Sequence, residues 1–309
     1  MYAVGAKSLE YLYVVLPYFN YCKFEQRTKL FVEFVQRNWM IKNVRLVIVE
    51  GFVDTPVLPS FSNNVMYHIK VKLRDQVWIK ENLINIAIRY LPKDWKYVAW
   101  IDADLTFLNE NWVNDTINLL KTFDVVQLFQ TAINMGPDGE AMKIDQGFGF
   151  MATRSGRPYH KNAKYGFWHP GFAWAIRRST FDTWGGLLDI GILGSGDRHM
   201  ALSLIEKGDY SYHGGVSNEY KKAVLDFQNK CAGMKLSYVP GTVMHHFHGS
   251  LKDRQYVDRW LILVRHEYKP YIDTYYDSNH VLRLTESGKR LQSDILDYFR
   301  ERKEDSKVA

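Results

Sequence analysis

Apolar runs and amphipathic stretches alternate along the first 130 residues of the chain. Residues 12–16 form an apolar, β-branched run and residues 44–50 form a second one, so both are predicted to be buried strands. Residues 24–39, between these runs, have the spacing of a helix. Further strands are predicted at 65–71, 97–101 and 124–129, and further helices at 77–90 and 112–122. Strands that alternate with helices predict an α/β protein built on a parallel sheet.

The rest of the pattern indicates how the chain is divided. Its 309 residues, 46% of them hydrophobic, suffice for one large core. No repeat or low-complexity linker interrupts the first 250 residues, which predicts a single domain over residues 1–250. Residues 251–309 are expected to form a helical extension, and the mixed-sign run at 300–307 is expected to be a solvated charged tail.

Composition restricts the partners and the compartment. The formal net charge of +6 favours anionic partners, such as a nucleotide, a polyanionic acceptor or a nucleic acid. Two cysteines, Cys22 and Cys231, cannot form a disulfide framework. The sequence contains no apolar run of membrane-spanning length, and the early run at 11–16 is short and ends at Pro17, which indicates a core strand rather than a signal peptide. A cytoplasmic location is therefore expected.

Two carboxylates, Asp102 and Asp104, follow the apolar run at 97–101, where a buried strand should reach solvent. A hard divalent cation prefers oxygen ligands and carries a diphosphate with it, so acidic residues at the C-terminal end of a strand suggest a nucleotide-sugar site. The structural alternative is a solvated strand end or a helix cap.

A third carboxylate follows a segment rich in aromatic residues and glycine at 165–176. Asp197 comes directly after the turn Gly194-Ser195-Gly196 and before a helical pattern. This position suits a general base at a helix start inside a cleft. The alternative is that Asp197 is the N-cap of that helix, and the two roles are compatible.

Three histidines, His245, His246 and His248, lie within four residues. Core packing explains such a cluster poorly, because each neutral ring needs partners for a donor and an acceptor. The cluster could bind zinc by itself, but no H-E-x-x-H motif or cysteine quartet accompanies it. A metal site shared with Asp104 is the more economical interpretation.

Together, the α/β half, the Asp102-Ala103-Asp104 motif, the aromatic-glycine segment with its following Gly196-Asp197 and the late histidine cluster resemble the metal-dependent glycosyltransferases of the GT-A fold. The likeness covers roughly residues 11–260. It is greatest to inverting enzymes related to the β-1,4-galactosyltransferases and to viral and bacterial glycosyltransferase-like proteins. It implies a Rossmann-like nucleotide-diphospho-sugar transferase domain in an α/β chain.

The resemblance also implies roles for individual residues. Asp104 corresponds to the acidic residue that binds the divalent metal, Mn²⁺ or Mg²⁺, and Asp102 to its partner toward the metal or the ribose. His245 and His248 correspond to late metal or diphosphate contacts, and His246 should point away because adjacent side chains in a strand alternate. Asp197 corresponds to the catalytic carboxylate, although this chain has Gly196-Asp197-Arg198 where the family has an acidic doublet.

The remaining implied contacts are to the donor and the acceptor. Gly171 and Trp174 belong to the run that resembles the sugar platform. Pro17 and Asn20 follow the first strand as nucleotide-contacting loops do. Lys80 and Asn85 resemble positions that bind the base or the diphosphate.

The implied reaction transfers a sugar from a nucleoside-diphosphate donor, most simply a UDP-sugar, to an acceptor hydroxyl with inversion at the anomeric carbon. The acceptor could be a glycan, a protein side chain or a hydroxylated nucleic-acid base. Two other classes stay open: a zinc hydrolase built on the histidine cluster, and a non-catalytic protein that binds nucleic acid or glycans through its basic charge and aromatic residues. The sequence does not indicate the oligomeric state.

Overall fold

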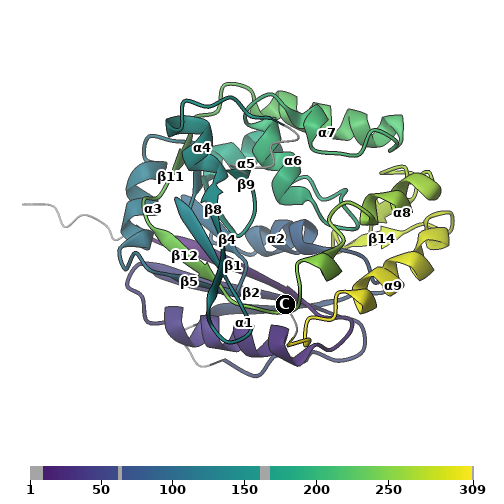
Figure 1. Cartoon of the computed structure of the whole chain (residues 1–309), viewed down its shortest axis with the longest axis horizontal. Helices are drawn as coiled ribbons and strands as arrows, with labels where there is room; N and C mark the ends of the chain where they lie inside the picture. Colours follow the sequence, from purple (N-terminus) through teal and green to yellow (C-terminus); the bar gives the residue numbers. More distant parts are fainter. Residues whose placement is uncertain (1–9, 62–64, 161–167, 308–309) are drawn as a thin grey trace, which may run out of the picture.

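A twisted seven-stranded sheet forms the centre of the computed structural model, which describes residues 10–61, 65–160 and 168–307 (Figure 1). The strand order is β11-β6-β10-β4-β1-β2-β3. The strands are β1 (Leu12–Phe19), β2 (Val44–Phe52), β3 (Val65–Lys72), β4 (Tyr97–Ile101), β6 (Val125–Gln127), β10 (Ala173–Arg177) and β11 (Leu236–Tyr238). The α/β class and the five strands predicted from the apolar pattern are confirmed.

The sheet is not fully parallel, because β10 runs antiparallel to both β4 and β6. The prediction of a parallel sheet is therefore wrong at this strand. The reason lies in where the chain enters β10: the Asp102 amide, just beyond β4, donates to the Phe172 carbonyl at 2.8 Å. Because β10 begins beside the carboxyl end of β4, it can only run backwards along it.

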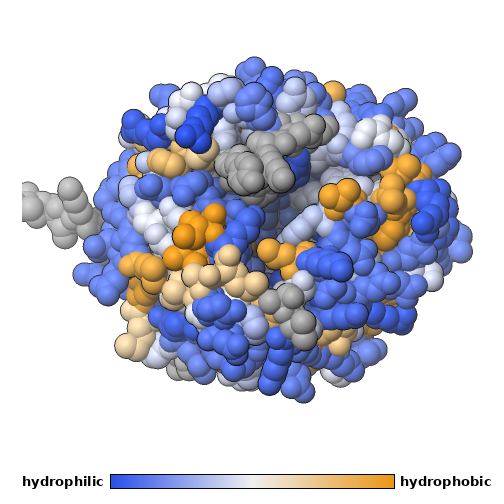
Figure 2. All heavy atoms as spheres, in the orientation of Figure 1, coloured by the Kyte–Doolittle hydropathy of each residue, from blue (hydrophilic) through white to orange (hydrophobic). Residues whose placement is uncertain are grey.

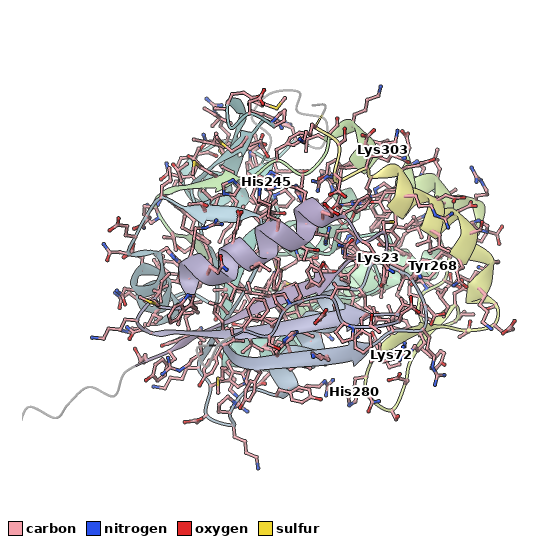
Figure 3. The ribbon with its side chains drawn as sticks, turned by 90° about the horizontal axis from the view of Figure 1, so that it is seen from below. Lys23, Lys72, His245, Tyr268, His280 and Lys303 are labelled. Atoms are coloured by element: carbon pink, nitrogen blue, oxygen red, sulfur yellow. The ribbon has the colours of Figure 1, made fainter. Side chains whose placement is uncertain are left out.

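Helices cover both faces of this sheet, and alternate residues of β1 show how. Leu12, Val14 and Leu16 pack with residues of α1 (Glu25–Asn38) and α3 (Trp112–Leu120), whereas Val15 and Phe19 belong to the core on the opposite face, which includes α2 (Lys80–Arg89). Figure 3 shows α1 lying across the strands. The other helices are α4 (Phe148–Arg154), α5 (Arg178–Trp184), α6 (Gly196–Ser203) and α7 (Asn218–Cys231).

A second, five-stranded sheet stands beside the end of β4. Its order is β5-β12-β7-β8-β9, with bounds of Leu105–Phe107 for β5, Thr131–Met135 for β7, Ala141–Gly147 for β8, Trp168–His169 for β9 and Thr242–His245 for β12. Because β5 starts directly after Asp104 and pairs with β12, this sheet brings the histidine cluster to the acidic motif.

The C-terminal segment, from residue 251 onward, packs into the main core. It contains α8 (Arg259–Arg265), the hairpin of β13 (Thr274–Tyr276) and β14 (Leu282–Leu284), and α9 (Gln292–Glu301), with short 3₁₀ turns at Lys252–Arg254 and Gly288–Leu291. Leu291, Ile295 and Tyr298 are buried in the same core as α2. The segment therefore carries a hairpin as well as the expected helices. Figure 2 shows apolar surface near α8, and Val257 and Leu261, just before and in this helix, are 74% and 48% exposed.

The expectation of a solvated tail at residues 300–307 is wrong for its central residues. The side chains of Arg302 and Glu304 are 4% and 1% exposed. Glu304 accepts from Arg302 and from Arg27 of α1, so opposite charges satisfy each other away from water. Within the described ranges, no helix is both long and apolar enough to cross a membrane.

Candidate functional site

The acidic motif lies where the two sheets meet. The central strand β4 is buried along its whole length and ends at Ile101, so Asp102 and Asp104 emerge at the carboxyl edge of the main sheet. Both sit at the transition from β4 into β5. This edge is where open α/β sheets bind ligands.

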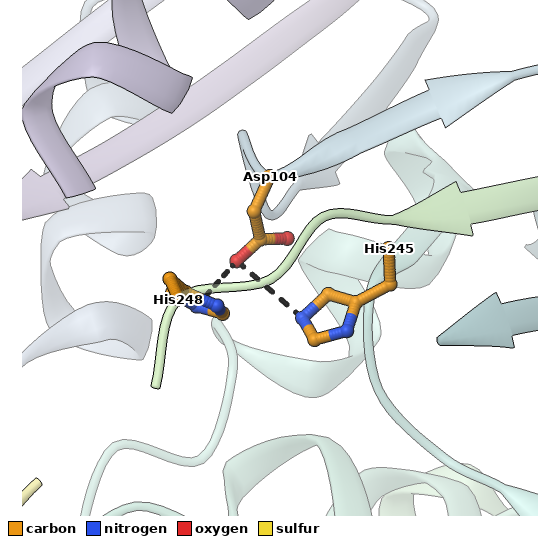
Figure 4. Close-up of side chains that lie close together, drawn as sticks. All are labelled: Asp104, His245 and His248. Atoms are coloured by element: carbon orange, nitrogen blue, oxygen red, sulfur yellow. Dashed lines mark ion pairs between the residues drawn. The ribbon is translucent and has the colours of Figure 1, made fainter. Parts of the chain in front are cut away.

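Strand pairing brings two histidines onto Asp104. His245 lies opposite Leu105 in the β12–β5 pair, and the His246 amide donates to the Asp104 carbonyl at 2.8 Å. His248 Nε2 then lies 3.0 Å from Asp104 Oδ2, and His245 Nε2 lies 3.8 Å from the same oxygen (Figure 4). The shared Asp104–histidine cluster expected from the sequence is present in the structure.

A relay of side chains orients His245. The Asn134 amide nitrogen donates to Asp145 at 2.9 Å, so the side-chain oxygen of Asn134 faces His245. An amide oxygen can only accept, so His245 Nδ1 is the donor of the 3.0 Å bond between them. This assignment leaves Nε2 as the unprotonated nitrogen, the one that faces Asp104. Outer hydrogen bonds of this kind commonly fix the ring of a metal-binding histidine.

His246 points away from the cluster, as strand alternation predicts. Its Nε2 makes a hydrogen bond with Thr106 Oγ1 at 2.8 Å on the other side of β12. A zinc site that uses all three histidines is therefore not formed in this structure.

Three observations indicate that the cluster of Asp104, His245 and His248 fits a metal ion. One donor atom each from Asp104, His245 and His248 lies within 4.8 Å of the others. In the described part of the chain, the buried Asp104 Oδ1 has no hydrogen-bond partner. Burial lowers the pKa of His245 to about 3 and also lowers that of His248, so both rings are neutral at pH 7, as metal ligation requires. One carboxylate with two imidazoles suits Mn²⁺ better than Mg²⁺, which prefers oxygen ligands alone.

A buried lysine joins two more of the predicted residues. Lys80 Nζ lies 2.6 Å from Asp102 Oδ1 and 2.9 Å from Asp197 Oδ2. Burial by itself lowers the pKa of Lys80, but the charges of Asp102 and Asp197 outweigh it and raise the pKa above its ordinary value. Asp102 thus faces Lys80 and is not one of the three clustered donors, so its predicted role as a metal ligand is not supported by this arrangement.

Asp197 lies inside the first turn of α6, while Ser195 occupies the N-cap position. The interpretation of Asp197 as the N-cap is therefore wrong. Its Oδ2 lies 3.7 Å from the point where a β-carbon on Gly171 would stand, so these two predicted residues are neighbours. Sequence reasoning missed Glu81, whose Cδ lies only 2.3 Å from the corresponding point on Gly196. Burial, and next the charge of Asp197, raise the pKa of Glu81 to about 8.

Three predicted contact residues have structural roles instead. Trp174 is fully buried and its Nε1 donates to the Pro170 carbonyl, so it is part of the core and not a sugar platform. The Asn85 amide exchanges two hydrogen bonds with the Leu187 backbone. Asn20 does the same with Phe24 at the start of α1. Residues 165–167 of the aromatic-glycine segment lie outside the described residues.

An open pocket adjoins the cluster. Asp102, Asp104 and His248 line it together with Pro17, and so do Arg27, Arg254 and Arg302. Sequence reasoning missed these arginines, because they come from α1, from the 3₁₀ turn after the histidine cluster and from the chain end, and no local motif connects them.

Comparison with known proteins gives distant structural likenesses only. No protein-family model matches the chain, and no curated protein matches it. The chain is similar to the catalytic domain of Drosophila β1,4-galactosyltransferase 7 in complex with xylobiose, with a TM-score of 0.36 and 14% identity over 64% of this chain and 62% of that one. A mutant of that enzyme in complex with manganese, UDP-Gal and xylobiose gives the same values.

The chain is also similar to residues 1–349 of S. aureus TarS, with a TM-score of 0.38 and 13% identity over 62% of this chain and 54% of that one. The chain thus spans less than two thirds of the solved chains that it matches. Likenesses this weak give no information on function, so function is inferred below from the site residues of this chain.

Proposed function

We propose that this protein is a metal-dependent glycosyltransferase that moves a sugar from a nucleoside-diphosphate donor to an acceptor hydroxyl. A UDP-sugar is the first candidate for the donor. The observation that carries the proposal is the pocket beside Asp104. It joins a carboxylate–imidazole cluster suited to Mn²⁺ with three guanidinium groups, and the Asp197 carboxylate stands close by, across Lys80.

The charges of the pocket suit a diphosphate. Arg27, Arg254 and Arg302 line it; Glu304 pairs with Arg27 and Arg302, and Arg254 donates to the His248 carbonyl at 3.1 Å. Guanidinium groups bind phosphate oxygens in a bidentate manner, and excess positive charge in a partly buried pocket attracts an anion. Pro17 and Tyr18 also line this pocket, and the nucleoside of the donor would pack against them.

Asp104, His245 and His248 would hold the metal ion. When bound there, the ion supplies positive charge that offsets the negative charge growing on the leaving diphosphate.

Asp197 is the proposed general base. Its carboxylate takes the proton of the acceptor hydroxyl, whose oxygen forms a bond to the anomeric carbon as the bond from that carbon to the diphosphate oxygen breaks. The nucleoside diphosphate leaves with the electron pair of the broken bond. A single displacement of this kind inverts the anomeric centre. Lys80 fixes one oxygen of Asp197, and Gly171 leaves room beside the carboxylate.

The acceptor of the proposed reaction is a glycan, a protein side chain or a hydroxylated nucleic-acid base, and an acceptor screen must separate them. The donor can be identified first, because UDP release from a UDP-sugar can be measured with water as the acceptor. The acceptor screen then uses that donor.

Thermal shift and calorimetry with UDP and MnCl₂ test the donor site. We expect UDP to stabilise the wild type only when Mn²⁺ is present, and Asp104→Ala and His245→Ala to lose this effect while they remain folded. His246→Ala is the matched control and should keep it, because His246 faces Thr106. Equal shifts in all four proteins would refute the proposal, and tight zinc binding with no response to UDP would favour the hydrolase.

A further inference from the structure

We infer that Arg259, in the C-terminal segment, is a positioning residue that sets the place of Asp197 through Ser195. The inference rests on the proposed function, since it concerns the geometry of the proposed base. Its starting point is an unusual contact: Arg259 Nη2 donates to Ser195 Oγ at 2.8 Å, across 64 residues of sequence.

The turn before α6 is held in a conformation that serine rarely adopts. Ser195 has φ of +81° and Gly194 has φ of +96°, both in the left-handed region. A serine at an N-cap ordinarily accepts a hydrogen bond from an amide of its own helix. In the described structure Ser195 makes no such cap, and its hydroxyl accepts from Arg259 instead. A strained residue persists only where its surroundings hold it in place.

Arg259 is built to hold this turn. It is 7% exposed and lies at the start of α8. Its Nη1 donates to the Tyr298 hydroxyl of α9 at 3.2 Å. The same Nη1 stands 3.0 Å from the point where a β-carbon on Gly194 would be, so glycine serves there for space as well as for its backbone angle. One guanidinium group therefore bonds both Ser195 and Tyr298 of the C-terminal segment, and it fills the space beside Gly194.

The turn is coupled to Asp197 by the start of α6. Asp197 follows Ser195 by two residues, and Gly196 between them packs directly against Glu81. A change in the Ser195 backbone would therefore move the Asp197 carboxylate relative to Lys80 and Gly171. Misplacement of a reacting group by about 1 Å can lower a rate by about 10²-fold.

The alternative role for Arg259 is that of a tether, which holds the C-terminal segment in place and has no effect on Asp197. Two kinds of variant separate these roles. Arg259→Met removes the guanidinium, and Ser195→Ala removes only the hydroxyl while Arg259 keeps its bond to Tyr298. Asp277→Asn is the matched control, because it breaks the Asp277–Arg283 ion pair and loosens the C-terminal hairpin without touching the turn.

The assay measures UDP release from the UDP-sugar that the wild type uses best, together with the dissociation constant of UDP in MnCl₂. Arg259→Met should lower kcat by about 10²-fold and Ser195→Ala by about tenfold, with UDP affinity within about threefold of the wild type. Arg259→Lys, which can still donate to Ser195, should recover part of the rate. Asp277→Asn should lower Tm and keep the wild-type kcat.

A kcat equal to that of the wild type in both Arg259→Met and Ser195→Ala would overturn the inference and leave the proposed function standing. The inference would also be overturned if Asp277→Asn lost kcat as well, with kcat falling in step with Tm across all the variants. That result would favour the tether role. Should Arg259→Met fail to fold, Ser195→Ala decides. Absence of UDP release by the wild type from every UDP-sugar would refute the proposed UDP-sugar donor, and the inference, which rests on that reaction, would fall with it.

Discussion

Replacement of Glu304 by glutamine is expected to destabilise the protein more than any change at its surface ion pairs. The Glu304 side chain is 1% exposed and binds two guanidinium groups: Arg27 Nη1 at 2.9 Å, and Arg302 Nη2 at 2.6 Å. Glu304→Gln keeps the size of the side chain but removes its charge. The buried Arg302 then loses its counter-charge, and Tyr298 can offer it only a neutral oxygen.

Breaking a buried ion pair by removing one partner costs about 3–5 kcal/mol. The lower end, about 3 kcal/mol, applies here because Arg27 is 23% exposed and can be rehydrated. With an unfolding entropy of about 2.1 cal/mol/K per residue, the 309 residues give about 0.65 kcal/mol/K in total. The expected loss of Tm at pH 7 is therefore about 5 °C.

The difference between the two proteins should depend on pH. Burial by itself raises the pKa of Glu304, but Arg27 and Arg302 outweigh it and hold the pKa well below the ordinary value of 4.5. A carboxyl group whose pKa is lowered by folding stabilises the protein fully above its unfolded value, and this stabilisation is lost as the pH falls toward the folded value. The Tm difference should therefore be constant above about pH 5 and shrink below pH 4.5.

Differential scanning calorimetry from pH 3 to pH 8 measures this effect. Asp297→Asn is the control, because it makes the same chemical change at the exposed pair with Arg300 and should leave Tm almost unchanged. If Glu304→Gln melts within 1 °C of Asp297→Asn at pH 7, the buried network does not stabilise the chain end as argued.

Three further predictions concern the site and its supports. Asp197→Asn should keep UDP affinity within a few-fold and lower sugar transfer by about two orders of magnitude; near wild-type transfer would mean that Asp197 is not the base. Asn134→Leu should weaken Mn²⁺ affinity by about 10–100-fold in calorimetry, because it frees the ring of His245, and an unchanged affinity would show that the ring needs no support. Asp305 accepts from the Glu25 and Gln26 amides at the start of α1, so Asp305→Ala should cost about 1 kcal/mol in urea unfolding, whereas no change would mean that water caps this helix equally well.

The local pattern of apolar and polar residues determined most of the strands and helices of the N-terminal half. The predicted helix at 24–39 and strands at 12–16 and 44–50 match α1, β1 and β2 closely, because hydrophobic periodicity reflects the side of each element that is buried. The same local reasoning placed Asp104 at a strand end and turned His246 away from His245, since both follow from strand geometry alone.

Only the tertiary structure decided which distant groups share the site. The pairing of β12 with β5 brings His245 to Asp104, and the direction of β10 is set by the place where the chain re-enters the sheet. Lys80, Arg259 and Glu304 carry charges that any solvated helix or tail could carry, so their sequence neighbours give no signal of burial. Each has a partner far away in the sequence, Asp197 for Lys80, Ser195 for Arg259 and Arg27 for Glu304, because charges can leave water only where the fold supplies an opposite charge or a hydrogen-bond partner.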